Sequence, residues 1–185
     1  MKNVEKHISK VLAKHKQGAV VMLELPAENY FETGADFIKL LANKGFRGLY
    51  VSFQRPYQNV ASLLKDKGVS LDKFLFVHAC TVPGEKPDPR CTCVPMDSGI
   101  DEFAKAIYTN LSRLKGKKKF IFVDSLTTIV LYKQLSEFMR FSEFLIREVK
   151  NNDKQVLLLF NVAKDVAQKK FIKDVALKAD EVIVV

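Results

Sequence analysis

Short, continuously apolar segments alternate with amphipathic segments along most of this chain. Apolar runs of this kind are typical of strands in a parallel sheet, because helices cover both faces of such a sheet. The amphipathic segments carry apolar residues at helical spacing and predict helices that connect the strands. The predicted strands are Val20–Leu25, Gly48–Phe53, Phe74–Ala79, Phe120–Asp124, Val156–Phe160 and Glu181–Val185. The sequence therefore predicts an α/β fold with a largely parallel central sheet and helices on both faces.

The chain has 185 residues, a length that suits one well-buried domain and is short for two. Because no internal repeat and no linker interrupts the pattern, we expect residues 1–185 to form a single α/β domain. Residues 1–17 are expected to contain an amphipathic helix, and the proline-rich residues 80–98 are expected to form a loop. The chain stops inside a predicted strand, which leaves open whether it is part of a longer protein.

The formal net charge of the chain is +9, which permits attraction to nucleic acid or other polyanions. The basic residues are spread out without interleaved aromatics, a pattern that also fits a solvated, lysine-rich surface. No apolar run approaches the roughly 20 residues that a transmembrane helix needs. The basic N-terminus lacks the apolar segment of a secretory signal. We therefore expect a cytoplasmic protein without membrane contact, for which nucleic acid stays an open partner.

The turn after the first predicted strand differs in its chemistry from a phosphate-binding loop. In phosphate-binding proteins such a turn is a glycine-rich loop, followed by lysine and serine or threonine, that surrounds the phosphate oxygens. Here the turn Leu25–Glu32 has no glycine and no lysine, and it carries Glu28 and Glu32. A helix is expected to begin near Thr33. Each carboxylate would repel a phosphate charge by roughly 1 kcal/mol at a separation of about 4 Å in water. We expect ATP binding at this turn to be weak or absent.

Polar and aromatic residues follow three predicted strands at their carboxyl ends, where ligands usually bind in open α/β sheets. The predicted ligand- or partner-binding crevice consists of Glu28, Asn29, Tyr30, Gln54, Arg55, Tyr57, Asp124 and Ser125. Tyrosine and arginine often anchor protein interfaces, so this set favours a protein partner. In the alternative interpretation, Tyr30 and Phe31 fold inward and fill the space that a phosphate would occupy.

All three cysteines of the chain lie close to the proline-rich segment. His78, Cys80, Cys91 and Cys93 are candidate zinc ligands, although their one-residue spacings differ from the usual spacings of zinc knuckles. A disulfide from Cys80 to either Cys91 or Cys93 is a second interpretation, since intracellular proteins of hyperthermophiles contain disulfides. We favour a third, in which the thiols are free in a loop and no zinc is bound. His78 then serves as a partly buried imidazole at the end of a strand.

The segments GLYVSF, FIFVDSLTT and KADEVIVV occur in this order in the chain. With the order of the predicted elements, they resemble the KaiC-like branch of the RecA ATPase superfamily over nearly all of residues 19–185. The resemblance implies a RecA-like fold in which the first strand leads into the phosphate-binding position. It also implies that Asp124 and Ser125 match the acid that helps to hold magnesium and the residue that follows it.

The same resemblance shows where the sequence departs from the family. Gln54-Arg55 stands where the family has paired glutamates that supply the catalytic base. Tyr30-Phe31 or Phe31-Glu32, depending on the register, stands where the family has Gly-Lys-Thr. The residues that bind phosphate and supply the catalytic base in the family are therefore both replaced, while the order of strands and helices is kept.

These replacements predict a RecA- or KaiC-like protein that does not hydrolyse ATP and acts as a regulatory or scaffolding protein. We assign no catalytic residue, expect no cofactor, and expect a protein partner or self-association. One alternative is an atypical nucleotide-binding ATPase that uses Asp124 with magnesium and ATP but lacks a standard phosphate-binding loop. Another is a basic recombination-accessory protein that binds nucleic acid.

Overall fold

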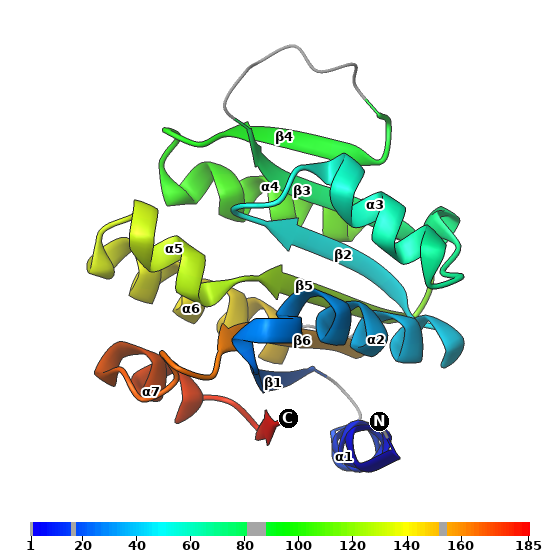
Figure 1. Ribbon diagram of the computed structural model, residues 1–185. Coiled ribbons are helices and arrows are strands. Elements are labelled where there is room, and N and C mark those ends of the chain that lie inside the picture. The colour runs from blue at the N-terminus through cyan, green and yellow to red at the C-terminus, as the bar shows by residue number, and fades with distance from the viewer. Residues whose placement is uncertain (1, 16–17, 81–87, 152–154) are drawn as a thin grey trace.

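The computed structural model describes residues 2–15, 18–80, 88–151 and 155–185. Seven strands form one sheet in this part of the chain (Figure 1), in the order β4-β3-β2-β5-β6-β1-β7. Their bounds are β1 Ala19–Leu25, β2 Arg47–Ser52, β3 Phe74–Cys80, β4 Cys91–Pro95, β5 Lys118–Asp124, β6 Gln155–Ala163 and β7 Glu181–Val184. Every pairing between neighbours is parallel. The predicted α/β fold with a parallel sheet is confirmed, and the carboxyl ends of the strands lie along one side of the sheet.

Helices cover both faces of this sheet (Figure 1). Their bounds are α1 Lys2–Lys14, α2 Tyr30–Asn43, α3 Tyr57–Asp66, α4 Ile100–Arg113, α5 Leu126–Tyr132, α6 Leu135–Lys150 and α7 Lys170–Ala176. Buried residues of α1, α2 and α3 pack on one face, and those of α4, α5, α6 and α7 pack on the other. None of the helices described is long and apolar enough to cross a membrane.

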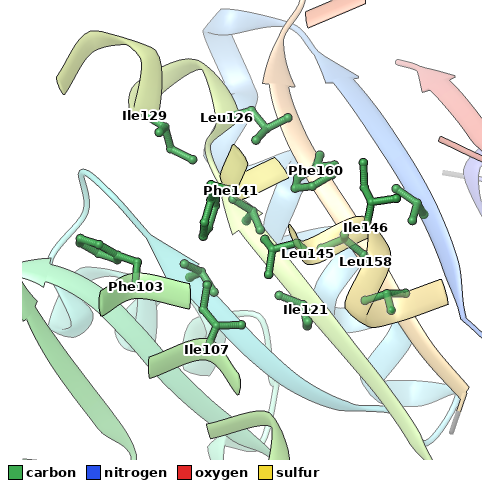
Figure 2. Packing of buried hydrophobic residues seen from close by; sticks show 14 of the residues in the cluster. Phe103, Ile107, Ile121, Leu126, Ile129, Phe141, Leu145, Ile146, Leu158 and Phe160 are labelled. Carbon is green, nitrogen blue, oxygen red and sulfur yellow. The ribbon is translucent and has the colours of Figure 1, made fainter. Parts of the chain in front are cut away.

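The core consists of two apolar layers, one on each face of the sheet. Side chains alternate along each strand, so that in β1 Val20 and Met22 enter one layer while Val21 and Leu23 enter the other. Figure 2 shows the layer beneath α4 and α6, where Phe141 of α6 lies beside β5 and Phe103 of α4 lies nearer to β2. Phe103 packs there against Phe53, the residue after β2, with ring centres 4.8 Å apart. This two-sided burial explains why the central strands are apolar throughout their length.

The start of α2 differs from the expected one. The helix begins at Tyr30, not near Thr33, and a short 3₁₀ turn over Ala27–Asn29 leads into it from β1. Tyr30 and Phe31 therefore belong to the first helical turn. Their side chains are held by the helix and are not part of an extended loop.

The expectation of a loop over residues 80–98 was wrong at Cys80 and over Cys91–Pro95. Cys80 is the last residue of β3, and Cys91–Pro95 form β4, which pairs in parallel with β3. The physical reason is that β4 lies at the edge of the sheet and Pro95 at its end, where a missing N–H costs little. Residues 81–87 of the expected loop lie outside the described residues. Helix α5 was not predicted either.

Candidate functional site

Asp124, the last residue of β5, is the centre of the candidate site. In the sheet it lies opposite Ser52, the last residue of β2, so the two strands end side by side. Asp124 is only 4% exposed. A carboxylate at this depth requires partners, because an unpaired buried charge is costly.

The partners of Asp124 come from β2 and from the turn that follows it. The Tyr50 hydroxyl donates a hydrogen bond of 2.5 Å to Asp124 Oδ2. Arg55 Nε lies 3.8 Å from the same oxygen, and the Arg55 guanidinium lies 4.0 Å above the centre of the Phe31 ring. The carboxyl group is therefore enclosed by a hydroxyl and by a cation that itself stacks on an aromatic ring.

A local turn fixes the position of Arg55. The Ser52 hydroxyl accepts a hydrogen bond of 2.8 Å from the Arg55 backbone N–H and donates one of 2.9 Å to the Arg55 carbonyl. The Phe53 backbone N–H donates to the Asp124 carbonyl at 3.0 Å. These bonds connect the residues after β2 to the end of β5. The guanidinium is thereby held over the site.

Tyr30, in the first turn of α2, closes the other side of the site. Its hydroxyl oxygen is buried and makes no well-aligned hydrogen bond to another described residue. Asp124 and Ser125 nevertheless lie close enough to act on it electrostatically. Burial, followed by the charge of Asp124, raises the pKa of Tyr30 well above its usual range. Tyr30 therefore remains neutral.

The electrostatic balance at Asp124 opposes its negative charge. Burial raises the pKa of Asp124 above its ordinary value, and the Tyr50 hydroxyl, Arg55, Tyr30 and Asn161 offset only part of that effect. The same burial, with the charge of Asp124, raises the pKa of Tyr50.

The predicted crevice residues divide into three groups in the structure. Tyr30, Arg55, Asp124 and Ser125 lie together, as described above, and Ser125 caps α5 by accepting a hydrogen bond from the Thr128 backbone N–H at 3.1 Å. Glu28, Asn29 and Gln54 are exposed at the rim.

Tyr57 forms the third group. It is 9% exposed and packs edge-on against Phe76 with ring centres 4.8 Å apart. Its hydroxyl donates to Asp88 at 2.7 Å, and burial, with this bond, raises its pKa to about 12. Tyr57 is thus directed away from Asp124, toward β3.

Two residues of the site were not predicted. Tyr50 lies two residues before Ser52, and the alternation along β2 and β5 brings it to the same face as Asp124. The sequence feature that could have identified Tyr50 is its hydroxyl group in an otherwise apolar strand, because a buried hydroxyl needs a hydrogen-bond partner. Asn161, in the middle of β6, is 1% exposed and also acts on Asp124.

A hollow of about 440 Å³ lies beside this site, at the ends of β1 and β6. It is lined by Pro26, Ala27, Glu28, Lys164 and Asp165. A larger hollow of about 730 Å³ lies between α4 and α6, on the face of the sheet that these helices cover and away from the predicted crevice.

Cys80 and Cys93 form a disulfide, with their Cα atoms 5.7 Å apart. This is one of the two predicted disulfide pairings, and the favoured interpretation of three free thiols was wrong for these residues. The pairing of β3 with β4 brings the two cysteines together. Among the described residues, no group of three His, Cys, Asp or Glu side chains is arranged to hold a metal ion. His78 is buried, and Cys91 is half-buried outside the disulfide.

No model of a protein family and no curated protein matches the sequence. Solved structures do match. A KaiC-like protein, PH0186, from the hyperthermophilic archaeon Pyrococcus horikoshii is similar over 91% of this chain and 71% of its own, at 17% identity and a TM-score of 0.61. PH0250 from the same organism covers 97% of this chain and 86% of its own, at 13% identity and a TM-score of 0.63.

A third similar structure is PH0321, also from Pyrococcus horikoshii, described as an uncharacterised protein in complex with an unknown peptide. It is 15% identical, covers 97% of this chain and 82% of its own, and has a TM-score of 0.63. At identities this low the likeness concerns the fold alone. The chain has a KaiC-like fold of the RecA type.

Proposed function

Proceeding from this KaiC-like fold, we propose that the protein is a RecA-type pseudo-ATPase that regulates or supports other proteins through direct contacts. The observation that carries the proposal is the enclosure of Asp124. In this fold the carboxyl ends of the strands are where a ligand would bind. Here Tyr50, Arg55 and the α2 residue Tyr30 occupy the surroundings of the carboxyl group.

The turn between β1 and α2 supports the same proposal. Charge-assisted hydrogen bonds from a phosphate-binding loop contribute about 1.5–3 kcal/mol each. In this chain the corresponding turn offers no lysine, and Glu28 and Glu32 are exposed there. Because Phe31 is stacked beneath Arg55, this cation is already engaged within the protein. The net electrostatic contribution to triphosphate binding at the turn is therefore unfavourable.

The exposed rim favours a protein contact. Glu28, Asn29 and Gln54 are exposed around the filled centre, and Glu28 also lines the adjacent hollow with Lys164 and Asp165. Such a surface presents both charges and amide groups, as the polar rims of transient interfaces do. We propose that this rim, and not Asp124 itself, contacts the partner or a second copy of the chain.

Turnover and association measurements test the proposal together. Phosphate release from magnesium–ATP is expected to stay at background, both for the wild type and for Asp124→Asn. Association, measured by sedimentation and by capture of partners from native extract, is expected to weaken in Glu28→Ala/Gln54→Ala. It is expected to stay unchanged in the matched control Glu102→Ala/Lys105→Ala on α4, whose residues are also exposed. Turnover that Asp124→Asn abolishes, or association equal in all variants, would contradict the proposal.

A further inference from the structure

The hollow of about 730 Å³ between α4 and α6 lies on the face of the sheet opposite α2 and α3. It extends from Ile100, at the start of α4, to Glu148, near the end of α6. Its floor is apolar and contains the buried ring of Phe141 and the half-buried side chains of Ala104 and Phe144. An apolar groove that follows two helices in this way has the form that receives a third helix.

The two helices that form the groove run in the same direction. Each leads back to a strand of a sheet in which all strands are parallel. Asp101 in the first turn of α4 is accordingly ion-paired with Arg140 in the second turn of α6, at 3.0 Å. About two turns further along each helix, Tyr108 lies level with Glu148. The groove therefore has Asp101 and Arg140 at one end and Tyr108 and Glu148 at the other.

A ridge of three side chains on α6 is complementary to itself. Arg140, Phe144 and Glu148 follow one another at intervals of four residues, and all three line the groove. Residues at this spacing form a ridge on a helix surface, with steps of about 6 Å along the axis. When two such ridges lie antiparallel with their Phe144 rings at the centre, each Arg140 faces the Glu148 of the other ridge. A twofold interface requires self-complementarity of this kind.

We propose that a second copy of this chain docks in the groove, so that α6 of each copy lies between α4 and α6 of the other. The twofold axis passes between the two Phe144 rings. Each Arg140 also approaches the Tyr108 ring of the other copy, which is 59% exposed and presents a face to the cation. Lys105 lies level with Phe144 and meets no charge of the second copy, so its replacement by alanine leaves the contact unchanged.

The size of the two helices determines how strong this contact is. With its 16 residues, α6 is about 24 Å long, and α4 and α6 together are about 20 Å wide. The contact therefore buries roughly 1,000 Å² in total, at the lower end of specific interfaces. Exposed ion pairs add little affinity, whereas like charges that face each other oppose association. The dimer is thus reversible, with aromatic side chains that supply the affinity and charges that fix the register.

Charge reversal at the two ends of the ridge tests the proposal. Sedimentation equilibrium of the purified chain at several concentrations gives the Kd of the dimer. In Arg140→Glu and in Glu148→Arg, like charges meet twice across the axis, so we expect the Kd to rise by at least about tenfold in each variant. An equimolar mixture of the two variants is expected to dimerise like the wild type, because every reversed charge then faces an opposite one.

A matched control is Glu102→Arg, which reverses an exposed charge of α4 that does not line the groove. Its Kd is expected to equal that of the wild type, and circular dichroism verifies that each variant is folded. Tyr108→Ala changes only an exposed side chain and is also expected to weaken the dimer. A wild type that stays monomeric up to about 1 mM would overturn the proposal. So would reversed or Tyr108→Ala variants with an unchanged Kd, or a mixture that stays monomeric.

Discussion

At the scale of single residues, a few polar groups around Asp124 determine the character of the candidate site. The sequence predicted that Asp124, Tyr30 and Arg55 would lie near one another, since all follow strands at their carboxyl ends. It could not predict the role of Tyr50, because that depends on the pairing of β2 with β5 and on their register. Nor could it predict that Tyr57 turns toward Asp88, because this bond joins segments 31 residues apart.

Two tyrosine variants test the assignment of these hydrogen bonds. Tyr50→Phe removes a bond of 2.5 Å to a buried carboxyl group and is expected to lower the free energy of unfolding by about 1.5–3 kcal/mol. Tyr30→Phe removes a buried hydroxyl that has no well-formed bond within the described structure, so stability should change by less than about 1 kcal/mol. Urea denaturation measures both changes. Equal losses in the two variants would show that the assignment is wrong.

The raised pKa of Asp124 predicts a pH dependence of stability. Burial raises its pKa in the folded state above the unfolded value of 3.8, so the folded state binds the proton more tightly. The contribution of this group is therefore fully present below pH 3.8 and is lost as pH rises through the folded-state pKa.

Asp124→Asn removes this titration while keeping a side chain of similar shape. The free energy of unfolding of the variant, relative to the wild type, is expected to rise as the pH increases above 3.8, because the folded wild type then loses its bound proton. Urea denaturation at several pH values gives this difference. A relative stability that falls over the same range would mean that the folded protein favours the ionised carboxylate.

At the scale of elements, the sequence predicted the main strands and helices to within a few residues, because burial on both faces makes the central strands uniformly apolar. It missed β4, where Pro95 argues against a strand unless its position at the end of an edge strand is known. It missed α5 because Leu126–Tyr132 spans only seven residues, too few for a clear helical period. The early start of α2 was missed although its N-cap is Asn29, a residue type that favours this position; the Asn29 side chain makes no capping hydrogen bond.

Gly48 in β2 provides a test of packing between elements. A Cβ atom at this position would lie 2.5 Å from Phe120 and 2.6 Å from Phe74. Gly48→Ala is therefore expected to destabilise the protein by about 1–3 kcal/mol through overpacking. A matched control is Gly99→Ala, where nothing lies within 4 Å of the added atom. Its effect should stay within about 1 kcal/mol. Thermal denaturation that ranks Gly99→Ala as the more damaging change would contradict the packing described here.

At the scale of the whole molecule, the resemblance predicted a fold that the solved structures bear out, with TM-scores of 0.61 to 0.63. The proposed loss of ATP hydrolysis is a separate matter, because structural similarity at low sequence identity indicates a shared fold but not a shared activity. It depends on the enclosed Asp124 and on the turn between β1 and α2. The partner of the protein could not be predicted, because neither a fold nor a charge pattern specifies it.

The net charge of +9 leads to a prediction about nucleic acid. Without stacking aromatics among the basic residues, association with single-stranded DNA should be electrostatic and indifferent to sequence. We expect fluorescence anisotropy to show weak binding at low salt that is lost between about 50 and 200 mM salt. Tight binding that persists at the higher salt concentration would favour the recombination-accessory alternative.

Under the proposed function, the nucleotide position of a KaiC-like fold is filled by the protein's own side chains. Titration calorimetry with magnesium–ATP tests it most directly, with Asp124→Asn as the matched variant. We expect no binding with a Kd below about 1 mM in either protein, because Tyr30, Tyr50 and Arg55 enclose Asp124. A micromolar Kd in the wild type that is lost in Asp124→Asn would contradict it and identify an atypical nucleotide-binding site.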